Sequence, residues 1–371
     1  ASAGTLIGSL PARAQQKRGG TFRAAIGHGS TSDTLNPGTW ENDFVNGLGY
    51  AFCGYLTGVR RDGSLEPQIA ESWEATPDAA EWRFKIRSGV TFHSGKPVTP
   101  DDVAASINFH RGEDSTSAAK PLVDPIEEIT TEGDTVVFKL KAGSADFPFT
   151  FTDYHLAILP AGDDRGIDWK SGDGCGPYKL KDFEPGVRVA VVKNENDWDS
   201  ERGFFDEIEV ISVVDPNART TALVSGDVHM IDRIDLKTVA LLGRDPKIKI
   251  HSVAGNQHYT FAMSVNKDPF TDVNVRRALK FGVNRQEMVD KILFGYGSIG
   301  NDHPIGRGQQ FFNGEMAQTE YDPDKAKFFL KEAGLDSIDV ELSAADAAFA
   351  GAVDAGILFQ NSAAAAGINL K

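Results

Sequence analysis

The sequence predicts a mixed α/β protein of two domains. Its 371 residues are more than one average domain needs. Segments with strand-like alternation and segments with helix-like spacing of apolar residues follow one another through roughly the last hundred residues, which is typical of an α/β lobe. The 38 glycines and 17 prolines fit a chain with many loops between these elements.

The composition argues against several functions. Acidic residues outnumber basic ones by 53 to 38, which gives a net charge of −15 at pH 7. Such a surface repels phosphate backbones, so we expect no nucleic-acid partner. There is no run of about 18 apolar residues that could cross a bilayer as a helix. The 2 cysteines are too few for a disulfide scaffold or a cysteine-based zinc site.

The first residues resemble the end of an export signal. Residues 1–19 begin with small and apolar residues, and Ala12 and Ala14 precede a polar run, as at a signal-peptidase site. The alternative is a flexible N-terminus without function. Export would place Cys53 and Cys175 in an oxidising compartment. The sequence does not decide whether they pair, and two separate buried thiols are expected.

Strands are predicted first by alternation and by flanking turn residues. They are expected at residues 21–26, 71–75, 81–87, 91–93, 135–140, 178–180, 187–192, 208–213, 230–231, 261–265 and 338–342. Gly27 ends the first of them, and the turn Ser88-Gly89 follows the third. The final residues, 367–371, look like the beginning of a further strand.

Helices are predicted where apolar residues recur three and four positions apart. They are expected at residues 42–56, 99–109, 218–225, 272–283, 284–293, 322–333 and 349–366. The second helix has the best-marked beginning, because Thr99 can cap it, Pro100 suits its first turn and Asp102 stands at the capping-box position. Gly226 and Gly334 mark the ends of two others.

No catalytic or metal-binding motif is present. The histidines are His28, His93, His110, His155, His229, His251, His258 and His303, with no pair four residues apart and no H-E-x-x-H. There is no Gly-x-Ser-x-Gly elbow. Residues 94–96 imitate the end of a phosphate-binding loop, but Gly89 is one residue too far upstream and Pro97 replaces the required Ser or Thr. We therefore predict neither an enzyme nor a bound cofactor or metal.

Several segments together resemble one family. They are 67–73 (PQIAESW), 81–103 (EWRFKIRSGVTFHSGKPVTPDDV), 176–178 (GPY) followed by Pro185, Gly186, Asn194 and Trp198, 272–279 (DVNVRRAL) with Asn284 and Arg285, and 321–326 (YDPDKA) with 332–334 (EAG). This order resembles the extracellular solute-binding proteins of the peptide/nickel type, family 5, which serve ABC importers. One departure is Cys175, which replaces the usual small hydroxyl residue before Gly-Pro-Tyr.

The resemblance implies a two-lobed clamp with an extra inserted α+β subdomain in the first lobe. Residues 20–55 and 175–255 would form the first lobe, 56–174 the insert, and 256–371 the second lobe. Family members continue well beyond this length. We therefore expect that part of the second lobe, and with it part of the ligand pocket, is missing from this chain.

The implied function is ligand binding in the periplasm. The ligand would be a small peptide or a peptide-like, amine-bearing compound such as an opine, and hinge closure of the lobes would present it to an ABC transporter permease. The protein itself would be a monomer. The same family also binds metal chelates, haem and sugars, and these alternatives remain open. Alternatives of another class are a peptidase-like enzyme in the same cleft and a clamp that docks on another protein.

Ligand contacts are expected on loops at strand ends. The candidates are His28, Ser30, Thr31, Trp40, Glu41 and Asp43, then Gln257, His258 and Tyr259, then Asn301, Asp302 and His303, and finally Asp346. The carboxylates could pair with an ammonium group, and the aromatic rings of Trp40 and Tyr259 could stack on a cationic or apolar group. The competing interpretation is that many of these residues only form turns, or pack in the core.

Overall fold

The structure is a computed structural model that describes most of the chain. The described residues are 17–60, 62–162, 166–253, 255, 257–307, 309, 311–345 and 348–371. The predicted export-signal remnant falls almost entirely on residues 1–16, which lie outside them. The chain divides into two compact units, Ala1–Ile234 and Asp235–Lys371. The predicted lobes, with residues 20–55 and 175–255 in the first and 256–371 in the second, stay a prediction.

The first unit contains a five-stranded sheet with the order β11-β1-β10-β9-β8. Its strands are β1 (Thr21–Ile26), β8 (Tyr178–Glu184), β9 (Arg188–Lys193), β10 (Glu207–Ser212) and β11 (Met230–Ile231). Strand β1 is parallel to both β10 and β11, whereas β8, β9 and β10 are antiparallel. The parallel pairing brings segments that are about 200 residues apart in sequence to the same edge of the sheet.

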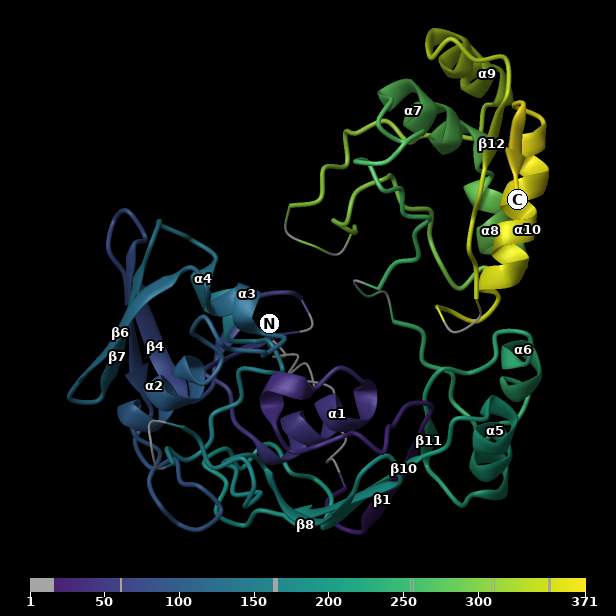
Figure 1. The fold of residues 1–371 in the computed structure, drawn as a ribbon. Coiled ribbons are helices and arrows are strands. Elements are labelled where there is room, and N and C mark those ends of the chain that lie inside the picture. The colour runs from purple at the N-terminus through teal and green to yellow at the C-terminus, as the bar shows by residue number, and fades with distance from the viewer. Residues whose placement is uncertain are drawn as a thin grey trace, which may run out of the picture. The chain divides into compact units, whose positions relative to one another are not determined.

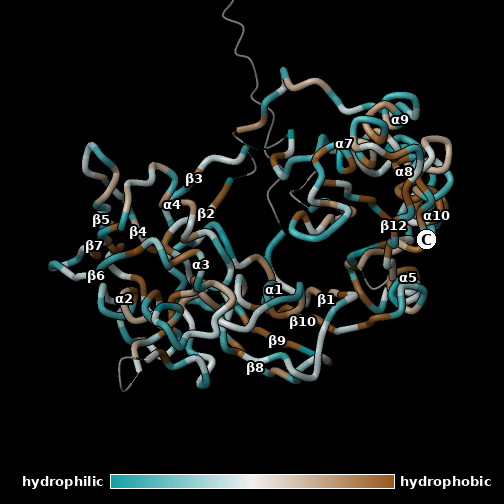
Figure 2. Tube along the Cα trace, turned by 45° about the horizontal axis from the view of Figure 1, so that its top comes forward, coloured by the Kyte–Doolittle hydropathy of each residue, from teal (hydrophilic) through white to brown (hydrophobic). Residues whose placement is uncertain are grey.

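Helix α1 (Asp43–Phe52) covers one face of this sheet (Figure 1) and contacts β8 and β9. It begins where the side chain of Asn42 accepts a hydrogen bond from the amide of Phe44 at 3.0 Å. Figure 2 shows hydrophobic stretches along β9 and β10. The core between helix and sheet contains Trp40, Phe44, Val45, Leu48, Phe52, Cys53, Tyr178, Val189 and Val191.

A second, antiparallel sheet with the order β4-β5-β7-β6 lies between β1 and β8 in the sequence. Its strands are β4 (Ala70–Ala75), β5 (Glu81–Ile86), β6 (Ile126–Glu132) and β7 (Thr135–Leu140). Helix α2 (Pro100–Asn108) packs against it, and the predicted capping box of Thr99 and Asp102 is confirmed. The sheet has its own core, which includes Phe84, Phe92, Ile107, Phe138, Phe147 and Phe151. That residues 56–174 bound this insert stays a prediction.

Shorter elements complete the first unit. They are η1 (Pro37–Thr39), β2 (Thr57–Val59), β3 (Leu65–Pro67), α3 (Lys120–Val123), α4 (Phe147–Thr150) and α5 (Pro216–Ser225). Helix α5 ends at Gly226, whose φ of 83° is the left-handed conformation that favours glycine. The strand predicted at 91–93 is only an isolated bridge between Thr91 and Pro97.

The second unit is mainly helical. Its elements are α6 (Val239–Leu242), α7 (Val273–Gly282), α8 (Arg285–Lys291), α9 (Pro323–Glu332), β12 (Ile338–Val340), α10 (Ala352–Ala364) and β13 (Ile368–Leu370). Strands β12 and β13 pair in parallel, α7 packs on α9 and α10, and α10 packs on β13. Asp272 and Asp322 cap α7 and α9 with their side chains, as their positions in the sequence predict.

The strand predicted at residues 261–265 is wrong. Phe261 and Met263 pack against the core of the second unit. However, the described residues offer them no hydrogen-bonded neighbour, and the segment is irregular. Alternation alone cannot create a strand when no partner completes its backbone hydrogen bonds.

The two cysteines lie in different cores. Cys53 packs in the core under α1, and Cys175 packs in the core of the inserted sheet. Both are buried and free, which confirms the prediction of two separate thiols.

Candidate functional site

Three parallel strands of the first unit end at one edge of its sheet. Residues Gly27, Val213 and Asp232 follow directly after β1, β10 and β11. In open α/β sheets, ligands bind outside the carboxyl ends of the strands. This edge is therefore the first place to look for a binding site.

A buried arginine on α5 binds the ends of two of these strands. Arg219 is 4% exposed. Its Nη1 donates to the carbonyl oxygens of Val213 at 2.6 Å and Val214 at 2.8 Å, and its Nη2 donates to the carbonyl of Arg233 at 3.1 Å. Its Nε lies 3.6 Å from Oδ1 of Asp232. Arg219 thereby fixes the backbone after β10 and β11.

Strand β1 joins this arrangement through Asp232 and Gly27. The amide of Gly27 donates to Oδ1 of Asp232 at 2.7 Å. A Cβ at Gly27 would lie 2.8 Å from the guanidinium carbon of Arg219, so a larger residue there would force Arg219 to shift. Within the described chain, the buried Oδ2 of Asp232 accepts no hydrogen bond.

An ion pair faces the solvent next to this buried one. Nη2 of Arg233 donates to Oδ2 of Asp43 at 3.1 Å, and Nδ1 of His28 lies 3.8 Å from the same oxygen. The side chains of Arg233 and Asp43 are 47% and 53% exposed. Asp43 stands in the first turn of α1 and Arg233 follows β11, so the pair connects two elements.

The ion pair with Asp43 alone does not explain why Arg233 is placed in this way. Its φ of 45° lies in the left-handed region, which costs a non-glycine residue about 1–2 kcal/mol. An exposed ion pair contributes roughly 0–1 kcal/mol. The backbone strain is thus at least as large as the gain from pairing with Asp43. Strain of this kind is concentrated at functional sites.

The surface beside the ion pair is acidic. Glu41 is exposed and precedes α1. Burial, then the carboxylate of Asp153, and more weakly those of Glu41 and Asp43, raise the pKa of Tyr154. This part of the first unit would therefore attract a cationic group.

The other candidates of the first unit have different surroundings. The hydroxyl of Ser30 lies 2.7 Å from that of Ser32, and its amide donates to Asp33 at 2.8 Å, so Ser30 helps to form its own turn. Thr31 is exposed beside it. Trp40 is 0% exposed, and its Nε1 donates to the carbonyl of Thr34 at 3.0 Å. The expectation that Trp40 stacks on a ligand is corrected, because its ring is enclosed in the core.

In the second unit, Asn301 and Asp302 brace a long loop. Nδ2 of Asn301 donates to the carbonyl of Ala317 at 2.9 Å, and its Oδ1 accepts from the amide of Thr319 at 2.9 Å. Oδ1 of Asp302 accepts from Arg285 at 2.8 Å. His303 follows, and its ring centroid is 6.2 Å from that of Phe312. Both Asp302 and Asp43 are paired with an arginine, but the side chain of Asp302 is only 22% exposed against 53% for Asp43, so Asp302 is the weaker candidate for a ligand ammonium.

The remaining candidates lie on irregular segments. Tyr259 is 46% exposed and stacks on Phe349, with centroids 4.0 Å apart and an interplanar angle of 14°. Gln257 and His258 precede it on an exposed segment. Asp346 lies outside the described residues. None of these observations tests whether the residues contact a ligand, so their role stays a prediction.

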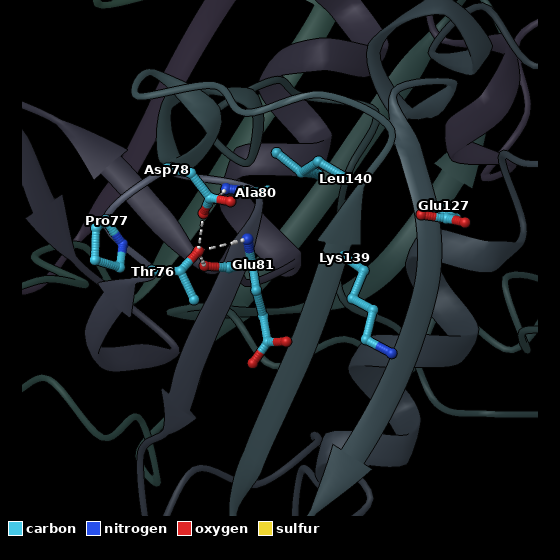
Figure 3. A pocket seen from close by; sticks show the side chains of 8 residues that line it. All are labelled: Thr76, Pro77, Asp78, Ala80, Glu81, Glu127, Lys139 and Leu140. Atoms are coloured by element: carbon cyan, nitrogen blue, oxygen red, sulfur yellow. Dashed lines mark hydrogen bonds between the residues drawn. The ribbon is translucent and has the colours of Figure 1, made fainter.

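The inserted sheet carries a shallow depression of about 610 Å³, lined by Thr76, Pro77, Asp78, Ala80, Glu81, Glu127, Lys139 and Leu140 (Figure 3). Several of its polar groups bond to one another. The hydroxyl of Thr76 donates to Asp78 at 2.6 Å and accepts from the amide of Glu81 at 3.0 Å. These contacts form the turn between β4 and β5, so the depression has few polar groups left to hydrogen-bond a ligand.

No metal centre emerges from the described residues. Among them, no three or more His, Cys, Asp or Glu side chains form a group that could hold an ion. None of the helices in the described ranges is both long enough and apolar enough to span a membrane.

Comparison with known proteins decides the family. Residues 64–371 match the family model described as bacterial extracellular solute-binding proteins, family 5 Middle. The chain belongs to this family. Family 5 proteins bind solutes for transport and are not enzymes. The sequence resemblance is thereby confirmed.

Relatives of this family 5 chain agree in fold. It is 27% identical over 297 residues to Heme-binding protein A of Haemophilus influenzae, covering 73% of the chain but 54% of that protein. The chain thus spans about half the length of this relative. Among solved structures, AgaA of A. tumefaciens R10 in complex with agropinic acid matches with a TM-score of 0.77, 24% identity, and coverage of 95% of this chain and 72% of AgaA.

A second solved structure is the ABC transporter-associated periplasmic binding protein DppA of Helicobacter pylori, in complex with the peptide STSA. It matches with a TM-score of 0.75 and 21% identity, covering 96% of this chain and 73% of DppA. At such identities, these structures show the fold alone. They confirm the predicted fold class, that of the periplasmic binding proteins.

Proposed function

We propose that this protein is a periplasmic solute-binding protein that delivers a small peptide or a peptide-like, amine-bearing compound, such as an opine, to the permease of an ABC importer. Membership of family 5 supports the transport role. Relatives in complex with a peptide and with agropinic acid support the ligand class. The observation that carries the proposal is the exposed carboxylate of Asp43 at the carboxyl edge of three parallel strands, with Glu41 nearby.

We also propose that the protein is exported and that it does not alter its ligand chemically. The small residues before the polar run at 15–20 support passage through the secretory pathway. The parallel-strand edge carries two arginines, two carboxylates and a histidine in contact with one another, and among the described residues no hydroxyl or thiol is hydrogen-bonded to that histidine. The ligand would therefore be bound and released unchanged.

Haem and metal chelates are the nearest competing ligands, because a relative is named for haem binding. Such a ligand would require soft or imidazole donors from the protein. His28 is the histidine at the parallel-strand edge, and it lies beside Asp43. A single imidazole beside the carboxylate of Asp43 fits an amine better than it fits a metal centre.

A thermal-shift screen tests the proposal. The purified protein is heated with dipeptides, opines, sugar acids, haem and nickel–histidine, each at saturating concentration. A ligand at 100 times its Kd adds about 2.7 kcal/mol, which corresponds to a rise of roughly 5–10 °C in Tm. We expect the peptides or the opines to produce this rise. A rise with haem, nickel–histidine or sugar acids alone would refute the ligand class, and cleaved peptide in the recovered solution would refute the transport role.

A further inference from the structure

We propose that Asp43 and Arg233 together bind an unmasked α-amino acid group, in which an ammonium and a carboxylate are attached to the same carbon. This rests on the proposed function, since it concerns how that ligand is recognised. It separates two kinds of amine-bearing ligand. An ordinary peptide carries its ammonium and its terminal carboxylate on different residues, whereas a side-chain-linked peptide retains both on one carbon.

The first argument is accessibility. Asp43 and Arg233 come from elements 190 residues apart in sequence and meet at the edge where β1 and β11 end. Arg219 and Asp232 lie behind them, with side chains only 4% and 20% exposed. A solute approaching this edge therefore meets the outer pair first.

The second argument is unused hydrogen-bonding capacity. The pair is joined through one nitrogen of Arg233 and one oxygen of Asp43, 3.1 Å apart. A guanidinium has five N–H donors, and a carboxylate has four acceptor positions. Within the part of the chain that the structure describes, Nη1 of Arg233 and Oδ1 of Asp43 make no hydrogen bond. Asp43 can therefore bind an ammonium, and Arg233 a carboxylate, while the two side chains stay paired with each other.

The third argument is spacing. In an α-amino acid, two bonds of about 1.5 Å hold the ammonium nitrogen and the carboxyl carbon roughly 2.5 Å apart. The hydrogen-bonded nitrogen of Arg233 and oxygen of Asp43 are 3.1 Å apart, so the two side chains are adjacent. The carboxylate would bind the guanidinium through two hydrogen bonds, and the ammonium would bind the carboxylate of Asp43. In a peptide, neighbouring Cα atoms are already about 3.8 Å apart, so its ammonium and its terminal carboxylate are held further apart than in an α-amino acid group.

The fourth argument is charge balance. Arg219, Asp232, Arg233 and Asp43 contribute two positive and two negative charges that follow one another in space. A ligand group with a single charge would leave this network unbalanced, whereas a zwitterionic group leaves its net charge at zero. The left-handed backbone of Arg233, whose carbonyl is bound by Arg219, holds the guanidinium at this position.

The experiment compares two isomers, γ-glutamylalanine and α-glutamylalanine. They have the same composition and net charge, but only the γ-linked isomer has an α-amino acid group. Isothermal titration of the purified protein should give a Kd at least 10-fold lower for the γ-linked isomer. Arg233→Gln and Asp43→Asn should each weaken its binding at least 10-fold. Arg60→Gln, which removes a similarly exposed pair with Glu66 (3.2 Å), should leave it unchanged.

Each other outcome is decisive. Equal binding of both isomers, or undiminished binding by Arg233→Gln, would overturn the head-group inference and leave the proposed function standing. If neither isomer binds while another peptide or opine raises Tm, the inference alone fails. If no amine-bearing compound binds at all, the proposed function fails with it. The comparison of isomers uses the unaltered protein, so it stays informative even if a variant does not fold.

Discussion

The buried imidazole of His110 should make the first unit sensitive to acid. His110 follows α2 and is 0% exposed. Its Nδ1 lies 2.6 Å from the hydroxyl of Ser117, and among the described residues its Nε2 has no hydrogen-bond partner. The nearest titratable groups are His155 and Asp153, which are 2.6 Å apart. Burial, and then the charge of His155, lower the pKa of His110 to about 4.

The sign and size of the effect follow from this pKa. The pKa of a histidine in the unfolded chain is near 6.5, so below that pH the unfolded chain binds a proton that the folded chain does not bind. The free energy of unfolding therefore falls as the pH drops from 6.5 towards 4. The gap of about 2.5 pKa units corresponds to about 3 kcal/mol below pH 4. Between pH 7 and pH 5 the loss is about 2 kcal/mol.

Urea unfolding at pH 7 and pH 5 measures this loss. The 5 tryptophans all fall within residues 40–198, so their fluorescence reports on the first unit. His110→Asn keeps a donor for Ser117 but cannot titrate, and its loss between the two pH values should be about 2 kcal/mol smaller. His251→Asn, an exposed site in the second unit, controls for the removal of a histidine. Equal losses in wild type and His110→Asn would refute the reasoning.

Three further predictions concern the first unit. Gly27→Ala places a Cβ 2.8 Å from the guanidinium of Arg219 and should cost about 1–3 kcal/mol in urea unfolding; a stable variant would show that Arg219 can move aside. Arg219→Met leaves Asp232 without its buried cation and should cost about 3–5 kcal/mol. Adding Asp232→Asn should recover part of that loss, and no recovery would mean that the two do not interact. Burial raises the pKa of Cys53 and raises that of Cys175 to about 12, so a thiol reagent should label neither until urea unfolds the protein; rapid labelling at neutral pH would contradict their burial.

Local sequence signals predicted most elements well. The capping box at Thr99 and the caps at Asp272 and Asp322 are confirmed, because each depends on contacts within one helical turn. Strand β6 (Ile126–Glu132) was not predicted, since most of its residues are polar and exposed on both faces. Residues 126–132 form a strand because they pair with β7, and their own sequence does not reveal that pairing.

The candidate site shows the same limit. The sequence indicated His28, on a loop after a predicted strand, and Asp43, at the beginning of a predicted helix. It did not indicate Arg219, Asp232 or Arg233, because they reach the edge only through the pairing of β1 with β10 and β11. The polar residues directly after the short strand at 230–231 were the available signal, although this strand, predicted to be buried, has Met230 43% exposed. From the sequence, Trp40 looked like an aromatic ligand contact, but in the structure its ring is enclosed in the core.

The order of the strands also affects when the first unit can fold. During synthesis, β1 leaves the ribosome about 200 residues before its second neighbour, β11. At 5–20 residues per second, its hydrogen-bonding edges stay unpaired for roughly 10–40 s. The five-stranded sheet therefore cannot be completed until β11 has been made, which would keep a chain exported as proposed above from folding during its synthesis.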